Sequence, residues 1–321
     1  MKAPATIERH LVLVRALGWQ APEDWREIAE HVRALDRRIG VFLVDATGVA
    51  PESAAHAAQR PTLIVSPAPV KALGLSRGRV LCGRIIPKME QLRILNEAGV
   101  AVPSSRLLHP NATFDPKVWG DVVVLKPADI LSSSSGAGIS LMRTERLRFR
   151  PPQDYPEGHP GRRGPMIVQQ FIDTGAHVSS YRVLMFMGTP LYCQRMEAVA
   201  PRVELGAPDE VLETAPVAMQ SHEDRRAFVY EADVVDIARR AALAFPDIPL
   251  LGCDVLRDIG TGQLFVTEVN PGGNTWHFSS YLLAEERARN GAAFERERRE
   301  QLDAFGSAAV ALVGATWELA V

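Results

Sequence analysis

The chain has 321 residues, 46% of them hydrophobic, and a formal net charge of −2. A chain of this length can bury two or three hydrophobic cores, and a charge so close to zero argues against nucleic acid as a partner. No apolar run approaches the roughly 20 residues that a membrane-spanning helix needs, and the first residues lack the pattern of a signal peptide. Three scattered cysteines (Cys82, Cys193 and Cys253) form no metal-binding or disulfide spacing, which is typical of a reducing compartment. We therefore expect a soluble cytoplasmic protein that contacts neither nucleic acid nor a membrane.

Strand and helix patterns alternate over the first 85 residues. Short runs rich in Val, Ile and Leu predict strands at 11–15, 41–46 and 62–66. A longer segment that begins with Pro22 predicts a helix at 22–38. Alternation of this kind is typical of an α/β unit with a parallel sheet. Residues 1–85 are therefore predicted to form an N-terminal, Rossmann-like α/β domain.

The pattern changes after a helix that is predicted at 86–99, between Pro87 and Gly99. Short β-rich runs follow, and they predict strands at 121–127, 138–143, 165–172, 181–187, 189–197, 250–256 and 263–269. Two helical segments are predicted, at 223–245 and 278–318.

This second region is predicted to be α+β and to form two subdomains, at 86–180 and 181–321. The stretch 143–165 is rich in Arg, Pro and Gly, and we expect it to be an exposed connection.

Oxygen-bearing side chains are concentrated at the ends of the last two predicted strands. Glu268 and Asn270 are two residues apart, so they point to the same face of a strand. Asp254 interrupts the apolar run of the preceding strand, where a carboxylate is costly unless it is paired or metal-bound. If the two strands form a hairpin, the three side chains converge into an all-oxygen site suited to Mg²⁺. The alternative is an ordinary strand end followed by a turn.

A phosphate-binding segment is predicted after the strand that ends at Lys126. Four serines and two glycines follow this lysine, among them Ser132, Ser133, Ser134, Gly136 and Gly138. Backbone N–H groups of such a loop can surround an anion, and the lysine adds positive charge. The alternative is a flexible Ser/Gly linker. The segment does not have the spacing of a P-loop.

The order of these motifs resembles the carboxylate–amine ligases of the ATP-grasp superfamily, such as D-alanine–D-alanine ligases and ribosomal-protein glutamate ligases. The resemblance covers about residues 80–290. It implies an ATP-grasp fold, ATP as co-substrate, and Mg²⁺, with Mn²⁺ as an alternative, held by Asp254, Glu268 and Asn270. It also implies that Lys88, Lys126 and the Ser/Gly segment bind the nucleotide phosphates. The hinge that contacts adenine in the family resembles Gln169, Gln170, Phe171 and Ile172, with Gln170 where Glu is common.

The chain departs from the family where the acceptor substrate binds. Gly252 stands where some D-alanine-type ligases have an arginine, and the sequence after Asn270 has an unusual spacing. Arg182 and Arg195, on neighbouring predicted strands, are the candidate catalytic residues. Their alternative is a surface role in which they pair with Glu197 or Glu204.

Four residues after the metal motif are candidates for substrate contact: Gly273, Asn274, Trp276 and His277. We expect Trp276 to form an apolar wall of the acceptor site. For His277 the alternative is a position at the start of a helix without a functional role.

Three functions remain open from the sequence. The first is an ATP-dependent ligase that joins a carboxylate to an amine of a small amino-acid-like molecule or peptide through an acylphosphate. The second is an ATP-grasp kinase that phosphorylates a hydroxyl group, and the third is a non-catalytic nucleotide-binding module. The retained metal motif argues against the third. The sequence also leaves open whether the protein forms a homodimer.

Overall fold

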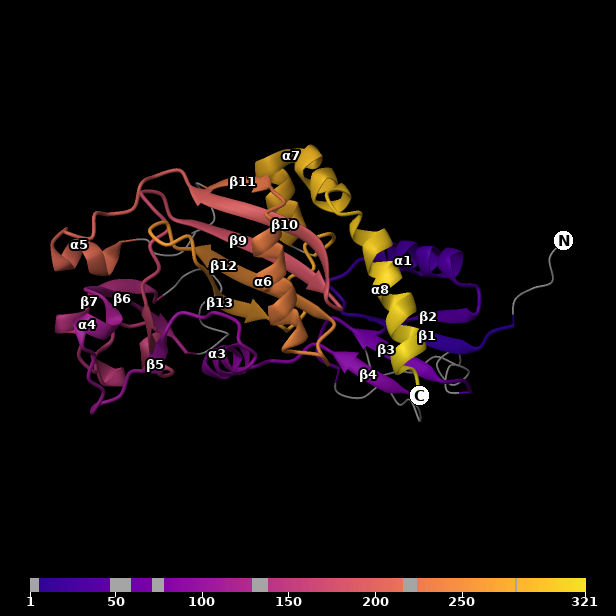
Figure 1. Cartoon of the computed structure of the whole chain (residues 1–321), viewed down its shortest axis with the longest axis horizontal. Coiled ribbons are helices and arrows are strands. Elements are labelled where there is room, and N and C mark those ends of the chain that lie inside the picture. The colour runs from indigo at the N-terminus through magenta and orange to yellow at the C-terminus, as the bar shows by residue number, and fades with distance from the viewer. Residues whose placement is uncertain (1–5, 47–58, 71–77, 129–137, 216–223, 281) are drawn as a thin grey trace.

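The computed structural model of the chain describes residues 6–46, 59–70, 78–128, 138–215, 224–280 and 282–321. Its strands form three sheets, which we call the N-terminal, small and large sheets. Figure 1 shows the N-terminal and small sheets at opposite ends of the long axis, with the large sheet between them.

The N-terminal sheet is parallel and has the spatial order β2-β1-β3-β4. Its strands are β1 (Arg9–Arg15), β2 (Ile39–Asp45), β3 (Thr62–Ser66) and β4 (Arg79–Cys82). The middle strands β1 and β3 are almost wholly buried, as a parallel sheet covered on both faces requires. Helix α1 (Pro22–Leu35) connects β1 to β2. The predicted α/β unit with a parallel sheet is therefore confirmed.

The small sheet is antiparallel and has the spatial order β5-β8-β6-β7. Its strands are β5 (Ser105–Leu107), β6 (Val122–Pro127), β7 (Ser140–Arg143) and β8 (Met166–Gln170). Helix α3 (Lys88–Glu97) precedes the sheet, and the short helix α4 (Pro116–Trp119) leads into β6. Pro87 stands just before α3, and Gly99 follows it with a positive φ of 72°, so both predicted ends of this helix are confirmed.

The large sheet is antiparallel and has the spatial order β11-β10-β9-β12-β13. Its strands are β9 (Ser179–Phe186), β10 (Thr189–Ala198), β11 (Asp224–Phe228), β12 (Leu250–Arg257) and β13 (Leu264–Asn270). Helix α6 (Ala232–Leu243) packs its buried Val, Ile and Ala side chains on one face of this sheet. Helix α5 (Asp209–Thr214) lies against β7 of the small sheet.

Two helices follow the large sheet. Helix α7 (Leu282–Glu300) is interrupted at Gly291, whose backbone is not helical. Helix α8 (Ala304–Leu319) packs against α1 and against strands of the N-terminal sheet. Among the described residues, none of the helices combines the length and the apolar composition that crossing a bilayer requires.

The position of α8 corrects the predicted domain boundaries. The backbone N–H of Thr62 in β3 donates to the carbonyl of Val321 at 3.0 Å, so the chain returns to the first sheet. One core cluster joins Leu11 and Trp25 of the N-terminal unit to Leu184 of the large sheet and Phe305 of α8. Residues 304–321 therefore lie with the N-terminal unit and not with the rest of the predicted subdomain 181–321.

The predicted helix at 223–245 is too long at its N-terminal end. Residues 224–228 form strand β11, which pairs with β10, and the helix begins at Ala232. Phe228, which lies within the range predicted as helix, ends β11 and packs against the ring of Phe294, at 4.7 Å between centroids. Tertiary pairing with an open sheet edge thus overrides the local helical pattern.

The stretch 143–165 is more than an exposed connection. It contains three 3-10 turns, at Thr144–Arg146, Pro152–Asp154 and Pro160–Arg162. Leu147 and Tyr155 are buried against the outward side chains of the small sheet. Apolar residues spaced between the arginines and prolines therefore hold this segment on the sheet.

The packing of α8 makes a prediction about stability. Phe305 is 2% exposed and stacks on Trp276, so Phe305→Ala should lower the free energy of unfolding by about 3–5 kcal/mol. Val310, on the same helix, is 60% exposed, and Val310→Ala should change the free energy by less than about 0.5 kcal/mol. Denaturant unfolding measures both values. Similar, small losses in both variants would contradict the assignment of α8 to the shared core.

Candidate active site

The register of the large sheet brings three charged side chains into one row. Asp254 in β12 is paired with Arg182 in β9 on one side and with Glu268 in β13 on the other. Residues that are directly paired point to the same face of a sheet. Asn270, two residues after Glu268, points to this face as well. The predicted hairpin of the two metal-motif strands is therefore present, and Arg182 stands next to it.

Asp254 is the centre of the row. The Arg182 guanidinium donates to both carboxylate oxygens of Asp254, through Nε to Oδ1 and through Nη2 to Oδ2, the latter at 3.0 Å. Asn270 Nδ2 donates to Oδ2 at 3.2 Å. Burial raises the pKa of Asp254, and Arg182 and Asn270 act in the opposite direction. A buried carboxylate of this kind needs positive charge beside it.

Two lysines from different elements reach the same strand. Lys88, the first residue of α3, has its Nζ 3.4 Å from Oε2 of Glu268. Lys126, near the end of β6, donates to the carbonyl of Thr267 at 3.5 Å. Burial lowers the pKa of Lys126 to about 8; the nearby Lys88 ammonium acts in the same direction and Glu268 opposes it. Two largely buried ammonium groups therefore meet over β13, which is an environment that favours a bound anion.

The donor atoms fit a hard cation. Asp254 and Glu268 contribute carboxylate oxygens and Asn270 contributes an amide oxygen, all on one face. The described residues contain no cluster of three or more His, Cys, Asp or Glu side chains suited to a metal. Two carboxylates and an amide leave room for the waters and phosphate oxygens that Mg²⁺ and Mn²⁺ usually keep.

Arg195 lies on the other face of the sheet. It is paired with Tyr181, whose ring packs in the core beneath α6, whereas Arg182 is paired with Gln194. Its guanidinium forms an ion pair with Glu197 at 2.7 Å, and the side chain is 44% exposed. The expectation that both arginines border one site is therefore corrected. Arg182 shares a face with its partner Gln194, and Arg195, the next residue along β10, points to the opposite face because side chains alternate along a strand.

Trp276 is also placed differently from the expectation. Its side chain is fully buried, stacks on Trp25 at 5.2 Å between centroids, and donates through Nε1 to Asp24 at 2.8 Å. Trp276 therefore belongs to the core that joins the N-terminal unit to the large sheet, and it forms no wall of an open site.

The other three residues of that turn have different surroundings. A Cβ on Gly273, which has a φ of +86°, would lie 2.5 Å from the carbonyl of Pro67, so this turn requires glycine. Asn274 is exposed. His277 lies close to Arg182, and burial together with the positive charge of Arg182 lowers its pKa well below the usual range. Of the four, His277 is therefore the one whose side chain is near the charged row.

The predicted hinge follows the small sheet. Gln169 in β8 is 5% exposed and donates through Nε2 to the hydroxyl of Ser105 at 2.9 Å. Gln170 ends β8, and Phe171 and the buried Ile172 begin the connection to β9. Phe171 packs against the same buried cluster as Val124, which lies two residues before Lys126 on the same face of β6. The segment thus connects the two sheets that carry the lysine and the carboxylates.

The predicted phosphate segment is described only at its end. Ser132, Ser133, Ser134 and Gly136 lie outside the described residues. Gly138 has a φ of +73°, and a Cβ there would lie 3.0 Å from the ring of Pro160.

A buried polar cluster next to Arg182 was missed by the sequence analysis. Arg298 of α7 is fully buried; it donates to the carbonyl of His277 at 2.7 Å and pairs with Glu286. Within the described part of the chain, no hydrogen-bond partner is present for Nε and Nη2 of Arg298, the hydroxyl of Tyr192 or Nε2 of Gln194. The i, i+2 spacing of Tyr192 and Gln194 puts both polar side chains on one face of a strand, and the sequence analysis could have used it. Arg298 could not be singled out, because it is one of many charged residues in its helix.

Comparison with known proteins gives structural neighbours only. No protein-family model matches the chain, and no curated protein matches it. The chain is similar to the ATP-grasp ligase PsnB complexed with minimal precursor, at 18% identity and a TM-score of 0.49, over 96% of this chain and 100% of that one. It is also similar to D-cycloserine synthetase DcsG, at 13% identity and a TM-score of 0.45, over 91% and 99% of the two chains. The D-alanine–D-alanine ligase from Bacillus anthracis has 10% identity and a TM-score of 0.43, over 96% and 97%. Because each TM-score is below 0.5, we base the function on the residues of this chain.

Proposed function

We propose that the protein is an ATP-dependent carboxylate–amine ligase of the ATP-grasp type. The observation that carries the proposal is the convergence of Lys88, Lys126 and the Asp254–Glu268 pair from four separate elements, α3, β6, β12 and β13. Two ammonium groups beside two carboxylates and an amide match the needs of a nucleotide triphosphate with its divalent cation.

The chemistry follows in two steps. A carboxylate oxygen of the acid substrate bonds to the γ-phosphorus of ATP while the bond from that phosphorus to ADP breaks, which gives an acylphosphate. The amine nitrogen then bonds to the acyl carbon, the carbon–oxygen bond to phosphate breaks, and the amine proton passes to solvent. Mg²⁺ bound by Asp254, Glu268 and Asn270 would supply neutralising charge for the phosphates. Lys88 and Lys126 would hold the phosphate oxygens.

Arg182 is the residue that we assign to the second step. Negative charge develops on the former carbonyl oxygen when the amine attacks, and a fixed guanidinium can stabilise it. Asp254 holds Arg182 through two hydrogen bonds, so little reorganisation is needed.

The substrate is proposed to be a small amino-acid-like molecule or a peptide. Tyr192, Gln194 and Arg298 present buried donor atoms that have no partner among the described residues, beside the Arg182 face. Unpaired buried donors are costly, and a substrate carboxylate or amide would satisfy them. This donor set favours a ligand that carries such groups over an apolar one.

A turnover assay with pairs of amino acids and short peptides tests the function. A ligase forms ADP and phosphate only when both an acid and an amine are present, and hydroxylamine in place of the amine yields a hydroxamate from the acylphosphate. ADP formation with an alcohol, without hydroxamate, would instead identify the kinase. Tight ATP binding without turnover across the whole panel would identify the nucleotide-binding module.

The metal site makes a prediction about Glu268. Glu268→Gln removes one of two carboxylates and should lower ATP turnover at least about 100-fold, beyond the 10- to 100-fold typical of groups that only support a ligand. Glu197→Gln, on the same sheet but paired with Arg195, is the matched control and should retain activity. Turnover is measured across a Mg²⁺ titration. Near-wild-type activity of Glu268→Gln at low Mg²⁺ would contradict the metal assignment.

The lysines make a prediction about affinity. Lys126→Ala should weaken ATP binding on the order of 10- to 100-fold, as expected for the loss of hydrogen bonds to a charged group. Lys88→Ala should have a smaller effect, and Lys117→Ala, which alters an exposed lysine, should have none. Calorimetric titration with a non-hydrolysable ATP analogue measures all three. Equal ATP affinity in all three variants would contradict the proposal that Lys88 and Lys126 bind the nucleotide.

The two arginines make opposite predictions. Arg182→Lys keeps the charge but loses the planar fork that contacts two atoms at once, so kcat should fall at least about tenfold. Arg195→Lys should leave kcat and KM unchanged, because Arg195 faces α6. Steady-state kinetics with the best substrate pair measures both constants. An effect of Arg195→Lys equal to that of Arg182→Lys would contradict the face assignment.

A further inference from the structure

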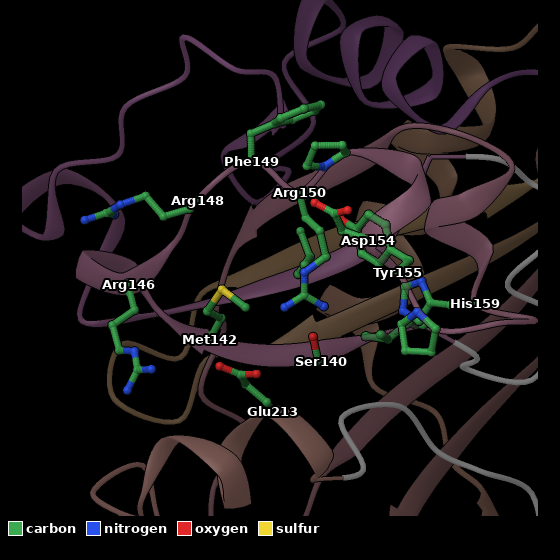
Figure 2. Close-up of a pocket in the computed structure, with 15 residues that line it drawn as sticks. Ser140, Met142, Arg146, Arg148, Phe149, Arg150, Asp154, Tyr155, His159 and Glu213 are labelled. Carbon is green, nitrogen blue, oxygen red and sulfur yellow. The ribbon is translucent and has the colours of Figure 1, made fainter.

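A hollow in the described part of the molecule lies away from the charged row. It has a volume of about 600 Å³ and lies between the small sheet and the segment 143–165. Figure 2 shows Ser140 and Met142 of β7 on one side and Arg150, Tyr155 and His159 on the other. The size is within the range of pockets that hold small organic ligands.

This pocket is on the opposite face of the small sheet from Lys126. Leu125 lines the pocket, and the next residue along β6, Lys126, points to the other face and reaches Thr267. Leu125 also belongs to the cluster that packs beneath Leu147 and Tyr155. The pocket is therefore separated from Lys126 by the thickness of the sheet, and Gly138, at the end of the predicted phosphate segment, lies at its border.

Three arginines line the pocket, and they differ in their partners. Arg146 forms an ion pair with Asp209, which also pairs with Arg143 at 2.9 Å. Arg148 donates to two backbone carbonyls, those of Glu145 and Leu147, both at 2.8 Å. These two guanidinium groups already have acceptors within the protein.

Arg150 is the exception among the three. Its guanidinium lies over the ring of Tyr155, 5.3 Å from the ring centre. In the part of the chain that the structure describes, it has neither an ion pair nor a hydrogen bond, although Asp154 and Glu213 line the same pocket. Figure 2 shows it in the middle of the pocket, above Ser140. Its charge is therefore available to a ligand.

The rest of the lining is aromatic and apolar. Tyr155 and His159 stack at 4.7 Å between ring centres, and Phe149, Met142 and Ile139 add apolar surface. Burial, followed by the positive charge of Arg150, lowers the pKa of His159, so this ring is neutral near pH 7. The two carboxylates disfavour a ligand with several negative charges.

We propose that this pocket binds a small organic carboxylate with an aromatic or apolar body. Arg150 receives the carboxylate, since its fork matches the two oxygens, and the Tyr155 and Phe149 rings contact the body. Glu213, across the pocket, accepts an ammonium group when the ligand is an amino acid. The site is independent of the proposed ligase function.

Calorimetric titration of the full chain with four probes tests the proposal. N-acetyl-L-phenylalanine and L-phenylalanine carry the carboxylate, L-phenylalanine amide lacks it, and phenyl phosphate offers a phosphate instead. We expect the two carboxylates to bind, the amide to bind at least about tenfold more weakly, and an ATP analogue with Mg²⁺ not to compete. Absence of carboxylate binding, tighter binding of phenyl phosphate, or displacement by the nucleotide would each overturn the proposal.

Variants locate the binding. Arg150→Gln should weaken the binding of N-acetyl-L-phenylalanine at least about tenfold. Arg163→Gln makes the same change at an exposed arginine of the same segment that does not line the pocket, and it should have no effect. Glu213→Gln removes a negative charge from the pocket and should strengthen the binding, which provides a test if Arg150→Gln fails to fold. Unchanged affinity in Glu213→Gln, or equal effects of Arg150→Gln and Arg163→Gln, would overturn the assignment.

Discussion

The pairing of β12 with both of its neighbours is the constraint on which the site depends. Asp254 is opposite Arg182 on one side and opposite Glu268 on the other, so one register sets the whole row. A slip by one residue would turn Asp254 towards α6, into a core of Val and Ile side chains, and would expose its apolar neighbours. The cost of burying a carboxylate there protects the register, so the residue that we propose as a metal ligand also specifies the strand pairing.

The energetics of the site are those of charges placed before their ligand arrives. Lys88 and Lys126 are largely buried; Lys88 lies 3.4 Å from Glu268, and Lys126 donates to the carbonyl of Thr267. They come from α3 and β6, while Glu268 comes from β13, so their closeness depends on how the small sheet sits against the large sheet. The arrangement of the two sheets holds two buried ammonium groups close together. The proposed ligand, an anion with its counter-cation, would place negative charge beside them.

Much of this was accessible from sequence, because it depends on local patterns. Runs rich in Val, Ile and Leu predicted three strands of the parallel unit, although not β4, and similar runs predicted the hairpin that carries Asp254 and Glu268. Pro87 marked the start of α3. The errors concern relations between elements. Arg195 was grouped with Arg182 because the sequence predicts that their strands are neighbours. Whether the two side chains point to the same face depends on the pairing register of the strands, which the sequence does not show. Trp276 follows the metal motif directly, yet its burial depends on Trp25, some 250 positions earlier in the chain, and no local pattern reports such a contact.

The return of the chain to its first sheet has a consequence for how the protein is made. During synthesis on the ribosome, domains generally fold as they emerge, the earliest first. Here the sheet of β1 to β4 is covered by α8, and β3 bonds to Val321, so the N-terminal unit lacks part of its cover until residues 304–321 have been translated. Its Trp25 surface has neither Trp276 nor Phe305 to pack on until those residues have been translated, and during that interval it is open to contact with other chains.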